Sequence, residues 1–198
     1  MSCYQGLSLS RTDSGDRKIG YADQWRKARE ENWFHLLLAD QSFFLFSEEN
    51  DKLSYSFFPC PLDIPTFSNF LASLDRQNSQ RNRAEYADQY QLVVETADLK
   101  AHITPIRFDQ DLASYRACTH PAAHLHIGLE NEIRIAVRRH LTPLAFVLFV
   151  IRQHYPQNWD QLMLHGDELK LHRRVREDLT LVPDERWSAV DEMQTYMH

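Results

Sequence analysis

The sequence predicts an α+β fold, in which an antiparallel sheet of hairpins packs on a central apolar helix with peripheral helices. Short segments rich in aromatic and β-branched residues occur in pairs separated by polar breaks, which is typical of β-hairpins. One segment, residues 143–154, is apolar on nearly every side, and such a helix is normally buried. Strand pairs and helical segments do not alternate regularly, which favours antiparallel over parallel pairing.

Length and composition indicate one globular domain. The chain has 198 residues, 43% of them hydrophobic and 25% charged, so it is long and apolar enough to bury a core. We expect residues 1–20 to form a flexible or irregular arm and residues 21–198 to form a single domain. Three widely spaced cysteines favour a reducing compartment, and no apolar run is long enough to cross a bilayer. Because the N-terminus also lacks a secretory signal pattern, we expect a cytoplasmic protein.

The first half of the chain predicts helices at both ends of a hairpin. Apolar residues recur at helical spacing over residues 21–39. Two aromatic segments, 43–46 and 53–57, flank a polar break and predict a hairpin. Three prolines in residues 59–65 exclude a helix or central strand there. Thr66 is expected to cap a short helix whose inner face includes Phe67, Phe70, Leu71 and Leu74.

The second half predicts two more strand pairs and the central helix. Residues 90–96 and 100–108 are expected to form a hairpin, with Pro105 at an edge or a bulge. Residues 124–128 and 132–137 are expected to pair as well. Thr142 followed by Pro143 predicts the start of the central helix, in which Phe146 and Phe149 should share a buried face. Shorter helical pieces are expected at residues 159–164, 168–179 and 184–197.

The segment THPAAHLHIG, residues 119–128, holds the densest group of polar side chains that could carry chemistry. His124 and His126 lie two apart on a predicted strand and should share a face, with His120 brought near them by the turn at Pro121. Asp109 ends the preceding strand and should lie within hydrogen-bonding reach of one imidazole. These four residues are the predicted catalytic group for acid/base chemistry, or they bind a divalent metal as cofactor. Alternatively, the histidines fix the turn and have no chemical role.

Charge along the chain is uneven. Residues 1–133 carry 13 Lys and Arg against 19 Asp and Glu, residues 134–176 carry 8 against 3, and residues 177–198 carry 1 against 6. The basic middle could bind an anionic partner, or it could be neutralised within the fold. The arginines predicted to bind a phosphate or another anion are Arg107, Arg134, Arg173, Arg174 and Arg176.

These motifs resemble an uncharacterised bacterial family, domain of unknown function 2290. The matching segments are Pro105 to Asp109, His120-Pro121 with His124 and Gly128, Arg134 to Val137, and Thr142-Pro143 to Tyr155. Ala136 stands where the family usually has proline. The resemblance implies a bacterial cytosolic protein of no assigned activity. A weaker likeness, carried by the order of Arg107, Asp109, His124, His126 and Gly128, is to histidine-rich toxins of bacterial toxin–antitoxin pairs.

Two functions are therefore expected to compete. The first is a non-catalytic subunit or accessory protein of a bacterial defence or toxin–antitoxin system, which contacts nucleic acid or a protein partner and no membrane. It is favoured because the candidate site lacks an evident nucleophile and a complete ligand set. The alternative is a small nuclease-like effector, in which the histidine cluster performs acid/base or metal-assisted phosphodiester chemistry.

Overall fold

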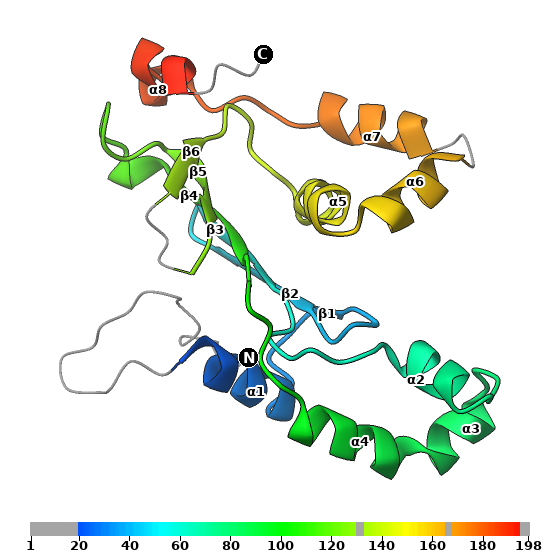
Figure 1. The fold of residues 1–198 in the computed structure, drawn as a ribbon. Coiled ribbons are helices and arrows are strands. Elements are labelled where there is room, and N and C mark those ends of the chain that lie inside the picture. Colours follow the sequence, from blue (N-terminus) through cyan, green and yellow to red (C-terminus); the bar gives the residue numbers. More distant parts are fainter. Residues whose placement is uncertain (1–19, 130–132, 165–167, 195–198) are drawn as a thin grey trace. The chain divides into compact units, whose positions relative to one another are not determined.

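The computed structural model describes residues 20–129, 133–164 and 168–194 (Figure 1). Six strands form one sheet, in which every strand lies beside the next strand along the chain. This order is that of an antiparallel meander. The pairs β1–β2, β3–β4, β4–β5 and β5–β6 are antiparallel, which confirms the predicted α+β class. The strands are β1 (Leu36–Leu37), β2 (Phe43–Glu49), β3 (Lys52–Phe58), β4 (Ile106–Asp111), β5 (Ala123–Ile127) and β6 (Ile133–Ala136).

Helices flank these strands in the sequence, and the chain divides into two compact units. The first unit contains the described residues up to 45 together with residues 58–104, and the second contains residues 46–57 together with the described residues from 105 onward. The predicted N-terminal arm lies outside the described residues, except for Gly20. The helices are α1 (Tyr21–Glu30), α2 (Phe67–Ser73), α3 (Gln80–Glu85), α4 (Ala87–Thr96), α5 (Pro143–His154), α6 (Pro156–Leu164), α7 (Glu168–Glu177) and α8 (Ala189–Gln194).

Helix α1 is shorter than the sequence predicts, so the expectation of a helix over residues 21–39 is wrong beyond Glu30. Asn32 adopts a positive φ of 55°, and the Trp33 amide donates to the Ala28 carbonyl at 2.8 Å. This is the hydrogen bond of a Schellman motif, which ends helices at a left-handed residue. The chain beyond it forms β1 instead.

The predicted hairpin over residues 90–108 is also wrong. Residues 90–96 belong to α4, and β4 pairs with β3 and β5. Tyr90 is buried, and Val94 and Ala97 pack against the first unit's core, so the apolar residues recur at helical spacing despite their β-branched composition. Pro105 precedes an internal strand and does not lie at an edge.

Two local predictions in this half of the chain are confirmed. β2 and β3 form the expected hairpin, whose turn residues Asn50 and Asp51 both have positive φ, as a two-residue hairpin turn requires. The Thr66 hydroxyl accepts a hydrogen bond from the Asn69 amide at 3.2 Å and caps α2. Leu74 is the exception within that helix's predicted inner face, because it follows the last helical residue and is 39% exposed.

In the second unit, one face of the sheet packs on α5. Tyr55, Phe108 and Leu125 lie side by side in register, and the Tyr55 ring contacts the ring of Phe146. Thr142 caps α5 and Pro143 begins it, as predicted. Phe146 and Val150 are fully buried, but Leu144 is 48% exposed and Phe149 is only partly buried. The uniformly apolar sequence of α5 therefore does not correspond to burial on every side.

The remaining predicted helices have counterparts in the second unit. α5 ends at His154, and α6, α7 and α8 follow close to the expected positions. Residues 195–198, the end of the last predicted helical piece, lie outside the described residues. No helix in the described ranges is both long and apolar enough to span a bilayer.

Candidate functional site

The face of the sheet opposite α5 carries polar side chains in two neighbouring rows. Because side chains alternate along a strand, the register that places Tyr55, Phe108 and Leu125 toward α5 places their neighbours on the other face. Ser54, Asp109 and His124 form one row. The second row contains Ser56, Arg107, His126 and Arg134. The sheet therefore collects residues from β3, β4, β5 and β6 on one polar face.

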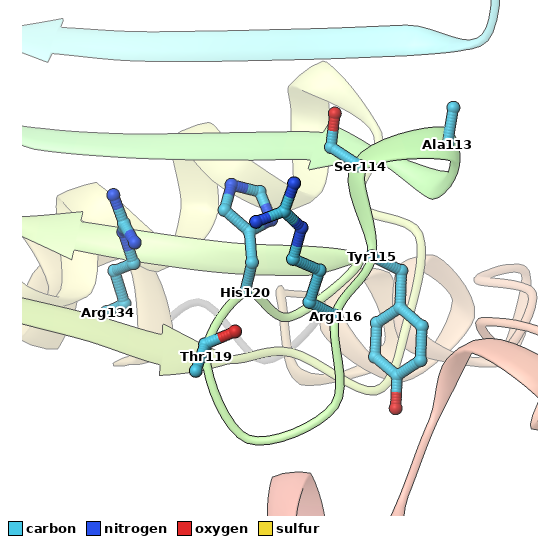
Figure 2. A pocket seen from close by; sticks show the side chains of 7 residues that line it. All are labelled: Ala113, Ser114, Tyr115, Arg116, Thr119, His120 and Arg134. Carbon is cyan, nitrogen blue, oxygen red and sulfur yellow. The ribbon is translucent and has the colours of Figure 1, made fainter.

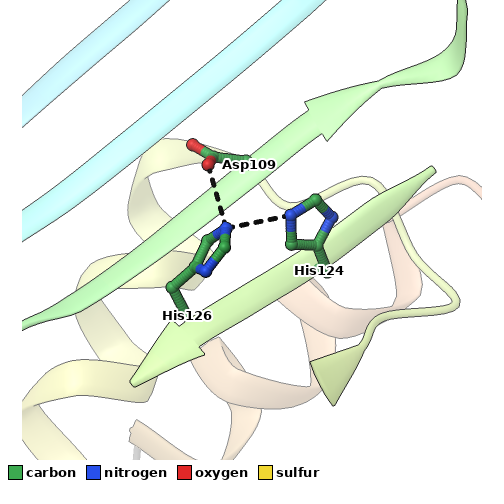
Figure 3. A group of neighbouring side chains, drawn as sticks. All are labelled: Asp109, His124 and His126. Carbon is green, nitrogen blue, oxygen red and sulfur yellow. Dashed lines mark hydrogen bonds and ion pairs between the residues drawn. The ribbon is translucent and has the colours of Figure 1, made fainter. Parts of the chain in front are cut away.

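Asp109, His124 and His126 converge on this face (Figure 3). The Nε2 atoms of His124 and His126 are 3.0 Å apart, and Nε2 of His126 lies 3.3 Å from Oδ2 of Asp109. The predicted shared face of the two histidines and the predicted proximity of Asp109 are both confirmed. One ligand-type atom from each residue lies within 4.8 Å of the other two.

Neighbouring groups orient two members of this trio, His124 and Asp109. Nδ1 of His124 lies 3.0 Å from the Pro121 carbonyl oxygen. Since a carbonyl oxygen only accepts, Nδ1 carries the proton, and Nε2 of the neutral ring presents a lone pair toward His126. Ser54 donates its hydroxyl to Oδ1 of Asp109 at 2.8 Å, and Nη2 of Arg107 lies 2.7 Å from Oδ2.

Burial and charge set the protonation states of two members. Burial, followed by the neighbouring His126, lowers the pKa of His124 to about 4. Burial alone would raise the pKa of Asp109, but the hydrogen bond from His126, the charge of Arg107 and the Ser54 hydroxyl outweigh it and lower that pKa. At neutral pH, His124 is therefore uncharged and Asp109 is ionised.

A tight loop places His120 beside this trio. The backbones of Arg116 and His120 exchange two hydrogen bonds of 3.0 and 2.9 Å, and Cys118 between them has a positive φ of 70°. The His120 ring packs edge-on against the His124 ring, with centroids 5.0 Å apart. Nδ1 of His120 is buried and has no hydrogen-bond partner among the described residues. The predicted proximity of His120 is confirmed.

The segment that leads into the loop carrying His120 is held by two aspartates. Asp111 accepts hydrogen bonds from the amides of Ala113 and Ser114 and from the Ser114 hydroxyl. Asp191, which is 1% exposed, accepts a hydrogen bond from the Tyr115 hydroxyl at 3.1 Å. These contacts hold residues 113–115, from which the turn at residues 116–120 continues with Arg116 and His120 at its two ends.

A pocket of about 550 Å³ opens beside His120 (Figure 2). Among the residues that the structure describes, its lining includes two guanidinium groups, those of Arg116 and Arg134, and no acidic side chain, so the charge of this described lining favours an anion. His124 and His126 do not line it, and they are 2% and 3% exposed. His120 therefore connects the pocket to the trio of Asp109, His124 and His126. The lining residues are Ala113, Ser114, Tyr115, Arg116, Thr119, His120 and Arg134.

The structure separates the five arginines that the sequence proposed for anion binding. Arg134 lines the pocket, whereas Arg107 pairs with Asp109. Arg173, Arg174 and Arg176 are exposed on α7 and do not belong to the pocket lining.

Two contributors escaped prediction from the sequence. Ser54 could have been found, because the alternation Ser54-Tyr55-Ser56 in a core strand marks a polar face. Arg116 carries no comparable local signal, since its position depends on how the loop closes.

The fold and the site define an α+β protein with a histidine-rich polar face on its sheet. A family model described as "Uncharacterized conserved protein (DUF2290)" matches residues 5–190, so the chain belongs to the DUF2290 family. This match confirms the resemblance drawn from the motifs, and no match supports the likeness to toxin families. No curated protein and no solved structure matches the chain.

Proposed function

We propose that the protein cleaves phosphodiester bonds of a nucleic acid in the pocket beside His120. The observation that carries this proposal is the placement of one imidazole and two guanidinium groups around one pocket, whose described lining residues include no acidic side chain. Arginine binds phosphate oxygens through paired hydrogen bonds, and histidine exchanges protons near neutral pH. Arg116 and Arg134 would hold the phosphate, and His120 would act on the proton of the nucleophile.

In this proposal the reaction is a hydrolysis. A water oxygen bonds to phosphorus, the bond between phosphorus and the leaving oxygen breaks, and the leaving oxygen takes a proton from solvent. His120 accepts the proton of the attacking water, while the two arginines stabilise the added negative charge of the transition state. His124 packs against the His120 ring and limits its orientation.

The experiment measures cleavage of short single-stranded RNA and DNA oligonucleotides and of bis(p-nitrophenyl) phosphate. Removing a general base costs roughly 10²–10⁴-fold in rate, so His120→Ala should lower kcat by that factor. Arg134→Gln should raise KM as well as lower kcat. His102→Ala and Arg81→Gln are the matched controls, because both residues are exposed and lie outside the pocket lining. Equal loss in the controls, or full activity of His120→Ala, would contradict the proposal.

The accessory-protein hypothesis is the second candidate, and it is favoured by the burial of His124 and His126. In that case the pocket binds an anionic segment of nucleic acid or of a partner protein without cleaving it, and the histidines stabilise the loop. Wild-type protein would then bind an oligonucleotide more tightly than Arg134→Gln does and leave it intact. A role in a bacterial defence or toxin–antitoxin system, and a cytoplasmic location, stay predictions from the sequence.

A further inference from the structure

We propose that Asp109, His124 and His126 bind a divalent first-row transition-metal ion. Three potential ligand atoms from two neighbouring strands converge here, within 4.8 Å of one another. Two imidazole nitrogens and a carboxylate oxygen form a ligand set used for Zn²⁺ and for Fe²⁺. This ligand set favours borderline ions of the first transition row over Ca²⁺ and Mg²⁺, which prefer oxygen ligands.

Two of the three distances between the ligand atoms suit one ion. Two atoms that each lie about 2.1 Å from an ion are about 3.0 Å apart when the angle at the ion is near 90°, and about 3.4 Å apart when it is tetrahedral. The observed separations are 3.0 Å between the two Nε2 atoms and 3.3 Å between Nε2 of His126 and Oδ2 of Asp109. A ligand atom of His124 and one of Asp109 form the third pair and lie within 4.8 Å of each other, so two of the three separations already suit one ion.

The surrounding hydrogen bonds prepare two of the ligands. Metal-binding histidines commonly donate their second N–H to a backbone carbonyl, which fixes the ring and its tautomer. His124 does this with the Pro121 carbonyl, so its Nε2 lone pair faces the trio. The Ser54 hydroxyl donates a hydrogen bond to Oδ1 of Asp109. Carboxylates that bind metal ions commonly accept such hydrogen bonds from groups that do not touch the metal. His126 would ligate through Nε2 in the tautomer that carries its proton on Nδ1.

The positive charge of Arg107 disfavours a cation at this site, because its Nη2 atom lies 2.7 Å from Oδ2 of Asp109. A carboxylate oxygen has two lone pairs, so Oδ2 can accept from Arg107 and still bind an ion. Asp109 offsets the charge of Arg107. Three protein ligands leave coordination positions open, as in catalytic metal sites, and His120 links this trio to the pocket. A bound metal would extend the proposed function, but its three ligands are not among the residues that line the pocket.

The test is a titration of EDTA-treated, full-length protein with Co²⁺, monitored by visible absorption and calorimetry, with Zn²⁺ as competitor. The exposed thiol of Cys118 is first changed to serine, because it could bind metal by itself. We expect one equivalent of Co²⁺ per chain, displaced by Zn²⁺. Asp109→Asn, His124→Ala and His126→Ala should each weaken binding at least tenfold, whereas the exposed-site control His102→Ala should not change it.

A pair of serines on one strand tests the supporting hydrogen bond. Ser54 bonds to Asp109, whereas Ser56 lies two residues along on the same face and pairs in register with Arg107. Loss of an outer hydrogen bond typically costs about 10–100-fold in metal affinity, so Ser54→Ala should weaken binding by about tenfold or more, and Ser56→Ala should not. Equal effects of the two changes would count against the proposed arrangement.

Nitrogen-15 NMR of wild-type imidazoles keeps the proposal testable if the ligand variants do not fold. Zn²⁺ should shift the Nε2 resonances of His124 and His126 at one equivalent. Failure of the wild type to bind Co²⁺ or Zn²⁺, or shifts confined to other histidines, would overturn the metal site.

His120→Ala separates the two proposals. It should lower the rate of phosphodiester cleavage by roughly 10²–10⁴-fold while retaining metal binding, because His120 is not one of the three ligands. Metal binding by the wild type without cleavage would refute the proposed function alone, and metal-independent cleavage with no binding would refute the metal site alone. Loss of metal binding in His120→Ala would overturn the three-ligand assignment.

Discussion

Replacing Phe146 by alanine should lower the free energy of unfolding by about 3–5 kcal/mol, the usual cost of deleting a buried phenyl ring. The side chain is fully buried on α5, and its ring centroid lies 6.0 Å from that of Tyr55 on β3. The deletion removes apolar surface from the core and leaves a cavity beneath the sheet. A rigid sheet collapses only partly into such a cavity, which places the expected cost within this range rather than below it.

Phe149 provides the matched control on the same helix. The sequence predicted that both phenylalanines would share a buried face, but Phe149 is only partly buried. Part of its surface already contacts water in the folded state, so Phe149→Ala should cost roughly 1–2 kcal/mol. Urea denaturation followed by circular dichroism gives both values, and hydrogen exchange of residues 143–154 shows whether α5 itself loosens. If the two substitutions cost the same, the assignment of the buried side of α5 is wrong.

Two further predictions concern reactive and charged side chains. In folded protein, iodoacetamide should label the exposed Cys118 and spare the buried Cys60. Cys60 should stay unreactive as the pH rises toward 9, because burial raises its pKa and keeps it in the thiol form. Mass spectrometry after digestion measures the labelling, and equal labelling of both cysteines would contradict the placement of Cys60 in the first unit's core. Changing Arg173, Arg174 and Arg176 to glutamate should weaken nucleic-acid binding and flatten its salt dependence. The protein should stay folded, because the three side chains are exposed on α7. Fluorescence anisotropy at several salt concentrations measures the affinity, and an unchanged affinity at every concentration would show that the basic segment has only an internal role.

The local sequence determined much of what surrounds the candidate site. Period-two alternation placed His124 and His126 on one face, and Thr142-Pro143 marked the start of α5. Each of these features depends on residues only a few positions apart in the chain, where backbone geometry imposes the outcome. The β2–β3 hairpin was predictable for the same reason, since its turn and its flanking aromatic residues lie close together in the sequence.

Tertiary structure decided the features that depend on distant partners. The segment around Val94 is helical because Tyr90 is buried and Val94 and Ala97 pack on the first unit's core at helical spacing, although its β-branched residues favour strands. Ser54 reaches Asp109 only because β3 and β4 pair in this register. Arg116 reaches the pocket through the closure of the 116–120 loop. Strand register and loop closure bring together residues that lie tens of positions apart, and no local pattern specifies which of them will meet.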